Sequence, residues 1–119
     1  MFKSTIETDK YGNNQKHYYL TQGDSFTIYA TPKKDGQAIS IDLISVCKFK
    51  LSDSAYVKEF EKELTKNETA KRFELNVTSE ESTNFDVASH IYEIEYTFKD
   101  GVVQTPNQWK FDVLDQIIE

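Results

Sequence analysis

The longest regular pattern in the chain is an alternation of apolar and polar side chains over residues 90–98. Tyr92 and Ile94 fall on one side of an extended backbone, and Glu93 and Glu95 fall on the other. Successive side chains of a β-strand point to opposite faces, so the pattern predicts a half-buried strand with an aromatic inner face. We expect it to be a central strand on which the others pack.

Shorter segments repeat this alternation. We expect further strands at residues 16–20, 25–30, 37–39, 45–51, 72–77, 102–104 and 108–113. The positions predicted to share one core are Phe49, Phe73, Leu75, Ile94, Tyr96 and Phe111. Two Asp-Gly pairs, at residues 35–36 and 100–101, indicate hairpin turns, because Gly takes a positive φ without steric cost.

Two segments carry helical signals. Thr78 and Glu81 match a capping box, in which the two side chains satisfy free backbone donors, and predict one helical turn near residues 79–84 with Phe85 beneath it. Residues 53–64 are ambiguous, because local propensity and a possible cap at their start favour a helix. The flanking strands favour a strand there, and we prefer that interpretation.

The pattern as a whole predicts an all-β, antiparallel, immunoglobulin-like (Ig-like) sandwich of about seven to eight strands with one short helical turn. No repeated helices are present to connect a parallel sheet. We expect residues 1–15 to form an N-terminal arm, residues 16–113 to form the sandwich domain, and residues 114–119 to form a C-terminal tail. The arm would be unordered or would order on a neighbouring chain.

Composition narrows the function. The 119 residues suit one domain, and a net charge of −6 argues against binding to nucleic acid, which needs clustered Lys and Arg. The single cysteine, Cys47, excludes an intramolecular disulfide. No apolar run has the length of a membrane span or a signal peptide, so we expect synthesis in a cytosol and no membrane insertion.

Catalytic and metal-binding patterns are weak. His17, His90 and Cys47 lie on separate predicted strands without the close spacing of zinc ligands, and Cys47 falls on an inward face. Glu93 and Glu95 share one strand face, whereas glycosidases place their two carboxylates across a cleft. The acidic loop residues Asp24, Glu80, Glu81 and Asp86 lack the spacing of a calcium loop. We therefore expect no enzyme activity, no cofactor and no metal.

Exposed aromatic residues are the more informative candidates. Tyr18, Tyr19, Tyr29 and Trp109 cannot all point inward, and the tail adds the apolar pair Ile117 and Ile118. Such aromatic side chains anchor a protein interface, fill a core edge or stack on a sugar. We take all six residues as interface candidates.

The order of motifs resembles a known family. The matching segments are residues 22–26, 34–36, 46–51, 73–75, 78–83, 92–96, 100–101, 104–105 and 110–113. They extend from about Leu20 to Val113. In this order they resemble the Ig-like β-sandwich domains of tailed-bacteriophage virion proteins, among them the N-terminal domain of the phage baseplate upper protein.

This resemblance implies a non-enzymatic structural module of a virion, either a tail or baseplate part or a head decoration or adaptor. It implies assembly in the host cytoplasm and partners that are other virion proteins or copies of the chain itself. Docking would use edge strands and termini. The alternative function is a carbohydrate-binding β-sandwich module, with host-surface carbohydrate as a possible ligand.

Overall fold

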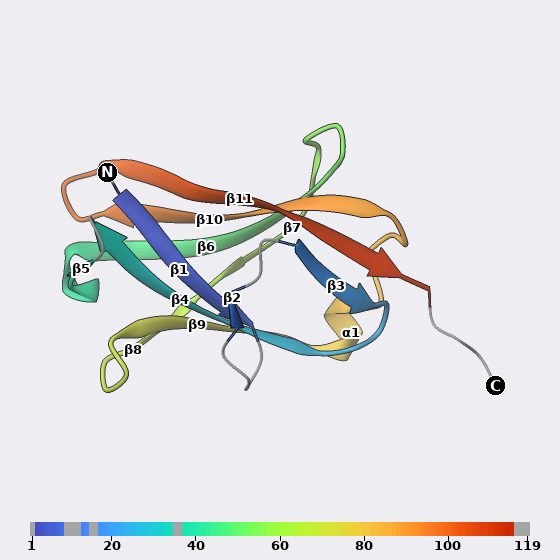
Figure 1. The fold of residues 1–119 in the computed structure, drawn as a ribbon, viewed down its shortest axis with the longest axis horizontal. Helices are drawn as coiled ribbons and strands as arrows, with labels where there is room; N and C mark the ends of the chain where they lie inside the picture. The colour runs from blue at the N-terminus through green and yellow to red at the C-terminus, as the bar shows by residue number, and fades with distance from the viewer. Residues whose placement is uncertain (1, 9–12, 15–16, 35–36, 116–119) are drawn as a thin grey trace.

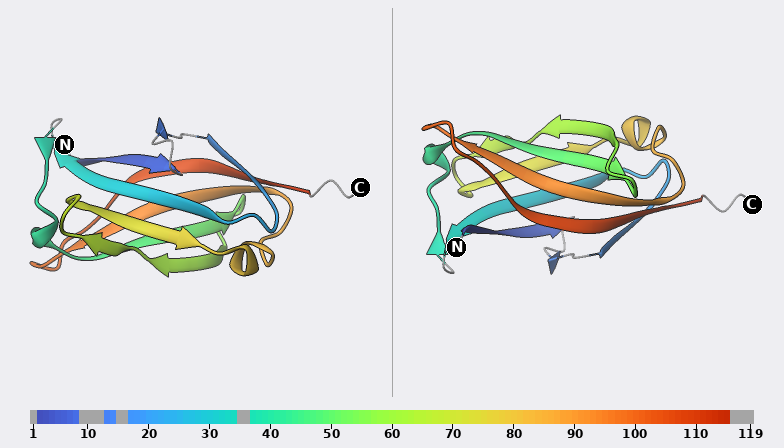
Figure 2. Two further views of the ribbon diagram at one scale, coloured as in Figure 1. Left: turned by 90° about the horizontal axis from the view of Figure 1, so that it is seen from below. Right: turned by 90° about the horizontal axis from the view of Figure 1, so that it is seen from above.

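The protein is a sandwich of two sheets, seen edge-on in Figure 2. The structure, a computed structural model, describes residues 2–8, 13–14, 17–34 and 37–115. The first sheet has the order β2 (Asn13–Asn14), β1 (Phe2–Thr8), β4 (Phe26–Lys34), β9 (Arg72–Val77) and β8 (Thr65–Asn67), with β5 (Gln37–Ala38) also paired to β4. The second has the order β3 (His17–Thr21), β11 (Val103–Leu114), β10 (Ser89–Phe98), β6 (Ile44–Asp53) and β7 (Lys58–Glu63).

This topology confirms the all-β sandwich. The long strands of the first sheet follow the order β1-β4-β9-β8, and those of the second follow β11-β10-β6-β7. When these long strands are lettered in chain order, from A for β1 to G for β11, the two sheets have the orders ABED and GFCC′ of an immunoglobulin-type sandwich. The predicted central strand is confirmed as β10, which pairs with β11 on one side and β6 on the other.

The predicted core is confirmed. Phe49, Phe73, Leu75, Ile94, Tyr96 and Phe111 are all buried, none with more than 2% of its surface exposed. Aromatic rings hold the sheets together by edge-to-face packing. The ring centroids of Phe73, in the first sheet, and Tyr96, in the second, lie 5.9 Å apart.

The N-terminal part of the chain differs from the prediction. Residues 2–8, expected to belong to a loosely attached arm, form β1, which pairs antiparallel with β4 from Phe2–Lys34 to Thr8–Ile28. Strand β3 then joins the other sheet and runs parallel to β11, so the sandwich is not wholly antiparallel. The first part of the chain therefore contributes a strand to each sheet.

Residues 53–64 form a hairpin arm, as the strand interpretation predicted. The Asp53 carboxylate accepts hydrogen bonds from the backbone N–H groups of Ala55 and Val57, both at 2.9 Å, which closes the β6–β7 turn. The Asp53 side chain therefore organises a turn and not a helix start. Strand β7 then pairs along β6.

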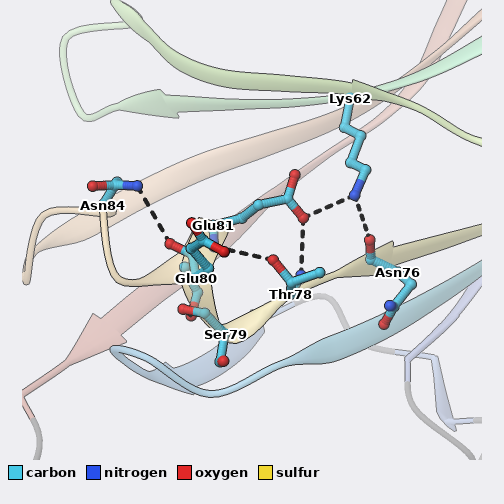
Figure 3. A network of polar contacts seen from close by, with 8 residues as sticks. Lys62, Asn76, Thr78, Ser79, Glu80, Glu81 and Asn84 are labelled. Carbon is cyan, nitrogen blue, oxygen red and sulfur yellow. Dashed lines mark hydrogen bonds and ion pairs between the residues drawn. The ribbon is translucent and has the colours of Figure 1, made fainter.

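The predicted helical turn is confirmed as α1 (Ser79–Ser82), with the capping box that the sequence predicted (Figure 3). The Glu81 backbone N–H donates to the Thr78 hydroxyl, and the Glu81 carboxylate accepts from the Thr78 backbone N–H. Lys62 reaches over from edge strand β7 and donates to both Glu81 Oε1 and the Asn76 carbonyl, each at 2.8 Å. These contacts tie the second sheet to the end of the first.

Candidate functional site

Exposed large apolar side chains lie mainly toward the two ends of the sandwich. They are Tyr19, Leu43, Tyr56, Val57, Val87, Val102, Val103 and Leu114, each between 46% and 63% exposed. The 3-10 turn η1 (Ile41–Leu43) and the β10–β11 turn form one end, and the other end carries α1 and the point where the chain leaves β11 (Figure 1). We call these the groove end and the tail end.

The outer face of the second sheet is charged instead. Lys50 Nζ donates to Glu95 Oε2 at 2.8 Å, and this hydrogen bond raises the pKa of Lys50 above its ordinary value. Gln108 donates to Glu93 Oε1 at 2.6 Å. Glu93 and Glu95 are thus engaged in cross-strand pairs on a sheet surface, and they do not face each other across a cleft.

The groove end contains an apolar depression. This end groove has a volume of about 650 Å³. It is lined by Ala38, Ile39, Ser40, Leu43, Phe98, Asp100, Val102 and Gln104. Pockets of this kind, apolar with a few polar groups, are the usual form of a binding site.

Backbone hydrogen bonds fix the walls of the end groove. Lys99 N–H donates to the Leu43 carbonyl at 2.9 Å and joins η1 to the end of β10. Phe98 N–H donates to the Val102 carbonyl at 2.8 Å, and the Asp100 carboxylate accepts from Val102 N–H at 3.0 Å. The groove is therefore preformed and not assembled around a ligand.

A polar depression adjoins the end groove. It has a volume of about 260 Å³ and shares Ala38, Ile39 and Ser40 with its neighbour. Asp42, Glu68 and Lys71 supply its charged lining. The combined depression therefore has an apolar part and a mainly acidic rim.

The tail end presents Tyr56 at the tip of the β6–β7 turn. Tyr56 has a φ of +65°, which is unusual for a residue other than Gly, and its surface is 63% exposed. It lines a shallow depression of about 330 Å³ with Ile91, Gln108, Trp109 and Lys110. An exposed aromatic side chain beside an amide and an ammonium group is suited to a polar ligand.

Neither Cys47 nor His90 is placed for chemistry at a surface. Cys47 is fully buried, and burial raises the pKa of its thiol far above its ordinary value, so the thiolate nucleophile is suppressed. His90 is buried, and its Nε2 donates to the Asp86 carbonyl at 2.8 Å. Within the described ranges no three His, Cys, Asp or Glu residues cluster as metal ligands do, and the side chain of His17 lies outside them.

The described interface candidates differ in how far their side chains are packed or exposed. Tyr18 packs between Phe26 and Phe111, with ring centroids 5.7 and 5.1 Å away, so it is a core-edge residue. Trp109 packs edge-on against Tyr92 at 5.8 Å, and Tyr29 lies under the Arg72 guanidinium at 3.9 Å. Tyr19 is 59% exposed, whereas Ile117 and Ile118 lie outside the described residues.

Leu43, Tyr56 and Val102 are among the exposed residues that the sequence interpretation missed. Each lies in or beside a turn, where alternation carries no information about which side faces solvent. The Asp53-Ser54 pair before Tyr56 was a usable turn signal, because Asp and Ser side chains bond to the backbone of nearby residues. Nothing in the sequence distinguishes Leu43 from a core residue.

No described helix is long and apolar enough to span a membrane. No family model and no curated protein matches the sequence. Among the solved structures that resemble the fold, two match over 98% of this chain, each with a TM-score of 0.55. One is CopC from Methylosinus trichosporium OB3b, at 10% identity and 98% coverage of that chain, and the other is a fibronectin(III)-like module of Clostridium thermocellum CbhA, at 14% identity and 100% coverage. At such identities the likeness concerns the fold alone: the chain is an all-β sandwich of the Ig and fibronectin-III type.

Proposed function

We propose that this chain is a non-enzymatic structural module of a tailed-phage virion that docks on other virion proteins or on copies of itself. The observation that carries the proposal is the distribution of exposed apolar side chains, which lie mainly toward the two ends of a sandwich. Exposed apolar clusters of this kind mark contact surfaces. The resemblance of residues 20–113 to the Ig-like domains of virion proteins supports the virion part of the proposal.

The composition of edge strand β7 favours docking through the ends of the sandwich over docking through this edge of the second sheet. Its sequence Lys-Glu-Phe-Glu-Lys-Glu places charged residues on nearly every position of an edge strand, and such charges discourage pairing with another chain. Lys62 and Glu81 further connect that side to α1. The exposed apolar side chains that could form an interface lie instead toward the ends of the sandwich.

The buried thiol supports a non-enzymatic role. Cys47, the single cysteine of the chain, is shielded from solvent and held as a thiol. The carboxylates Glu93 and Glu95 are engaged by Gln108 and Lys50. None of these groups forms a nucleophile, base and orienting partner in the described part of the chain.

Incorporation into particles tests the proposed function. A tagged copy of the chain is expressed in host cells during infection by the phage, and purified particles are probed for the tag. We expect the full-length chain to be present in particles and a variant lacking residues 114–119 to be folded but absent. The matched control is Lys58→Ala, an exposed change on β7, which should be incorporated normally. Absence of the full-length chain from particles would overturn the proposal.

The depression at Tyr56 supports a second candidate function, carbohydrate binding. Its exposed ring, the Gln108 amide and the Lys110 ammonium supply a stacking surface and hydrogen-bond donors. We expect this function to appear as binding to a glycan array that Tyr56→Ala abolishes and Val87→Ala leaves unchanged. An array with no binding above background would exclude it.

A further inference from the structure

We infer that the end groove receives residues 116–119 of a second copy of this chain, so that copies associate end to end. This inference rests on the proposed docking function and names its partner. The groove offers Ile39, Leu43, Phe98 and Val102 as an apolar surface, and Leu43 and Val102 are 55% and 47% exposed. Burial of such side chains stabilises an interface.

The occupant is indicated by the sequence that follows the last described residue. After Asp115 the chain continues with Gln116, Ile117, Ile118 and Glu119. Two adjacent β-branched apolar residues between polar ones suit a groove with an apolar centre and a polar rim. Leu114, where β11 ends, is itself 46% exposed and extends the apolar surface toward this segment.

Distance excludes the groove of the same molecule. The tail end and the groove end lie at opposite ends of a sandwich whose longest dimension is 48 Å (Figure 1). Four residues span at most about 14 Å when fully extended. Residues 116–119 therefore reach only the groove of another copy.

The two surfaces are different patches, so the contact is heterologous. Each pair of associated copies leaves one groove and one tail unoccupied, which allows a third copy to add. End-to-end association consequently gives open chains of increasing length or a closed ring. Two antiparallel copies related by a two-fold axis would instead fill both grooves side by side, so a population that stops at dimers would contradict end-to-end association.

Charge opposes the association at low salt. Asp42, Glu68 and Asp100 lie along the groove and its rim, with Lys71 as the basic neighbour, while Asp115 and Glu119 flank the incoming segment. Each copy also carries a net charge of −6. Salt screens this repulsion and leaves the apolar contact intact, so association strengthens as ionic strength rises.

Sedimentation velocity of the full chain tests the inference. We expect species larger than dimers at high protein concentration, and more of them in about 0.5 M than in about 0.05 M NaCl. Ile117→Asp with Ile118→Asp, on the tail, and Leu43→Asp, in the groove, should each weaken association by about tenfold or more. Val57→Asp, an exposed apolar site outside the groove, is the matched control and should associate normally. Val102→Asp replaces Leu43→Asp if that variant fails to fold.

A mixing experiment distinguishes this arrangement from other self-association. The tail variant retains its groove and the groove variant retains its tail, so a mixture of the two should form heterodimers and stop there. Dimers from each variant alone, or association unaffected by both variants, would overturn the inference. A chain that stays monomeric at every concentration and salt would also overturn it. Incorporation into particles would then still stand as evidence for docking on a different protein, so the two proposals fail separately.

Discussion

His90 and Glu59 meet where strand β7 bulges. Leu51 pairs with Phe60 and Ser52 pairs with Lys58, so Glu59 is the extra residue, and its Oε2 lies 2.6 Å from His90 Nδ1. Nδ1 is buried and makes no hydrogen bond in the described part of the chain, so the short distance describes an electrostatic contact. The other ring nitrogen, Nε2, donates to the Asp86 carbonyl, so both nitrogens of this buried ring face a polar group.

This contact predicts energetic coupling between the two side chains. Glu59→Ala leaves a buried ring nitrogen without its partner, and His90→Ala leaves the Asp86 carbonyl without its donor, so each should destabilise the fold by about 1–3 kcal/mol. The double variant should show a coupling of about 1 kcal/mol in urea unfolding. Glu63→Ala, on the same edge strand, is the control and should change stability little. Strict additivity of the two substitutions would show that the contact carries no energy.

Truncation in the core should be far more costly than truncation at the surface. Ile94 is fully buried and Phe73 is 1% exposed, so Ile94→Ala and Phe73→Ala should each lower the free energy of unfolding by roughly 2–5 kcal/mol. Lys99→Ala, an exposed change next to the β10–β11 turn, should have an effect within about 0.5 kcal/mol. Denaturant unfolding monitored by Trp109 fluorescence measures all three. A small loss for Ile94→Ala would contradict its place at the centre of the core.

Gly101 tests backbone strain without a packing change. Its φ is +92°, and a Cβ built there meets no atom within 4 Å, so a side chain has space but an unfavourable backbone. Gly101→Val should cost about 1–2 kcal/mol, and Lys99→Val should cost much less. Equal losses for the two variants, measured by thermal unfolding, would argue against a left-handed Gly in this turn.

The Lys62–Glu81 contact should contribute to stability at neutral pH and not in acid. The Lys62 hydrogen bond, followed by that from the Thr78 backbone, lowers the pKa of Glu81 in the folded state. The stabilisation is therefore present above the unfolded pKa and is lost as pH falls through the folded value. Lys62→Met should cost about 1 kcal/mol at pH 7, because the partly exposed pair is screened by solvent, and less below about pH 4. A deficit independent of pH would mean that Lys62 acts only through its contact with the Asn76 carbonyl.

Alternation was sufficient to predict the strands that form the core. In β10 and β9 every second side chain is buried, so period two was visible in the sequence. Strand β1 escaped prediction because it has few apolar residues and pairs fully only with β4. The parallel pairing of β3 with β11 was not predictable either, since a local pattern does not specify a distant partner or its direction.

The end groove was hidden for a different reason. Its apolar residues come from three separate stretches of chain, namely residues 38–43, Phe98 and the turn that precedes β11. None of these shows a period that separates an exposed residue from a buried one. The capping box at Thr78 was predictable because all of its interactions lie within four residues.

The parallel pairing of β3 with β11 has a consequence for synthesis on the ribosome. Residues 17–21 emerge early, whereas their partners at residues 110–114 emerge after the other strands of the sandwich. The β1–β4 pairing and then the β4–β9 pairing can form while translation continues, but this side of the second sheet waits for the final strand. Contacts between such distant parts of a chain also slow folding. Nascent chains stalled before residue 110 should thus display an incomplete sandwich that chaperones recognise, and release of the last strand should complete the fold.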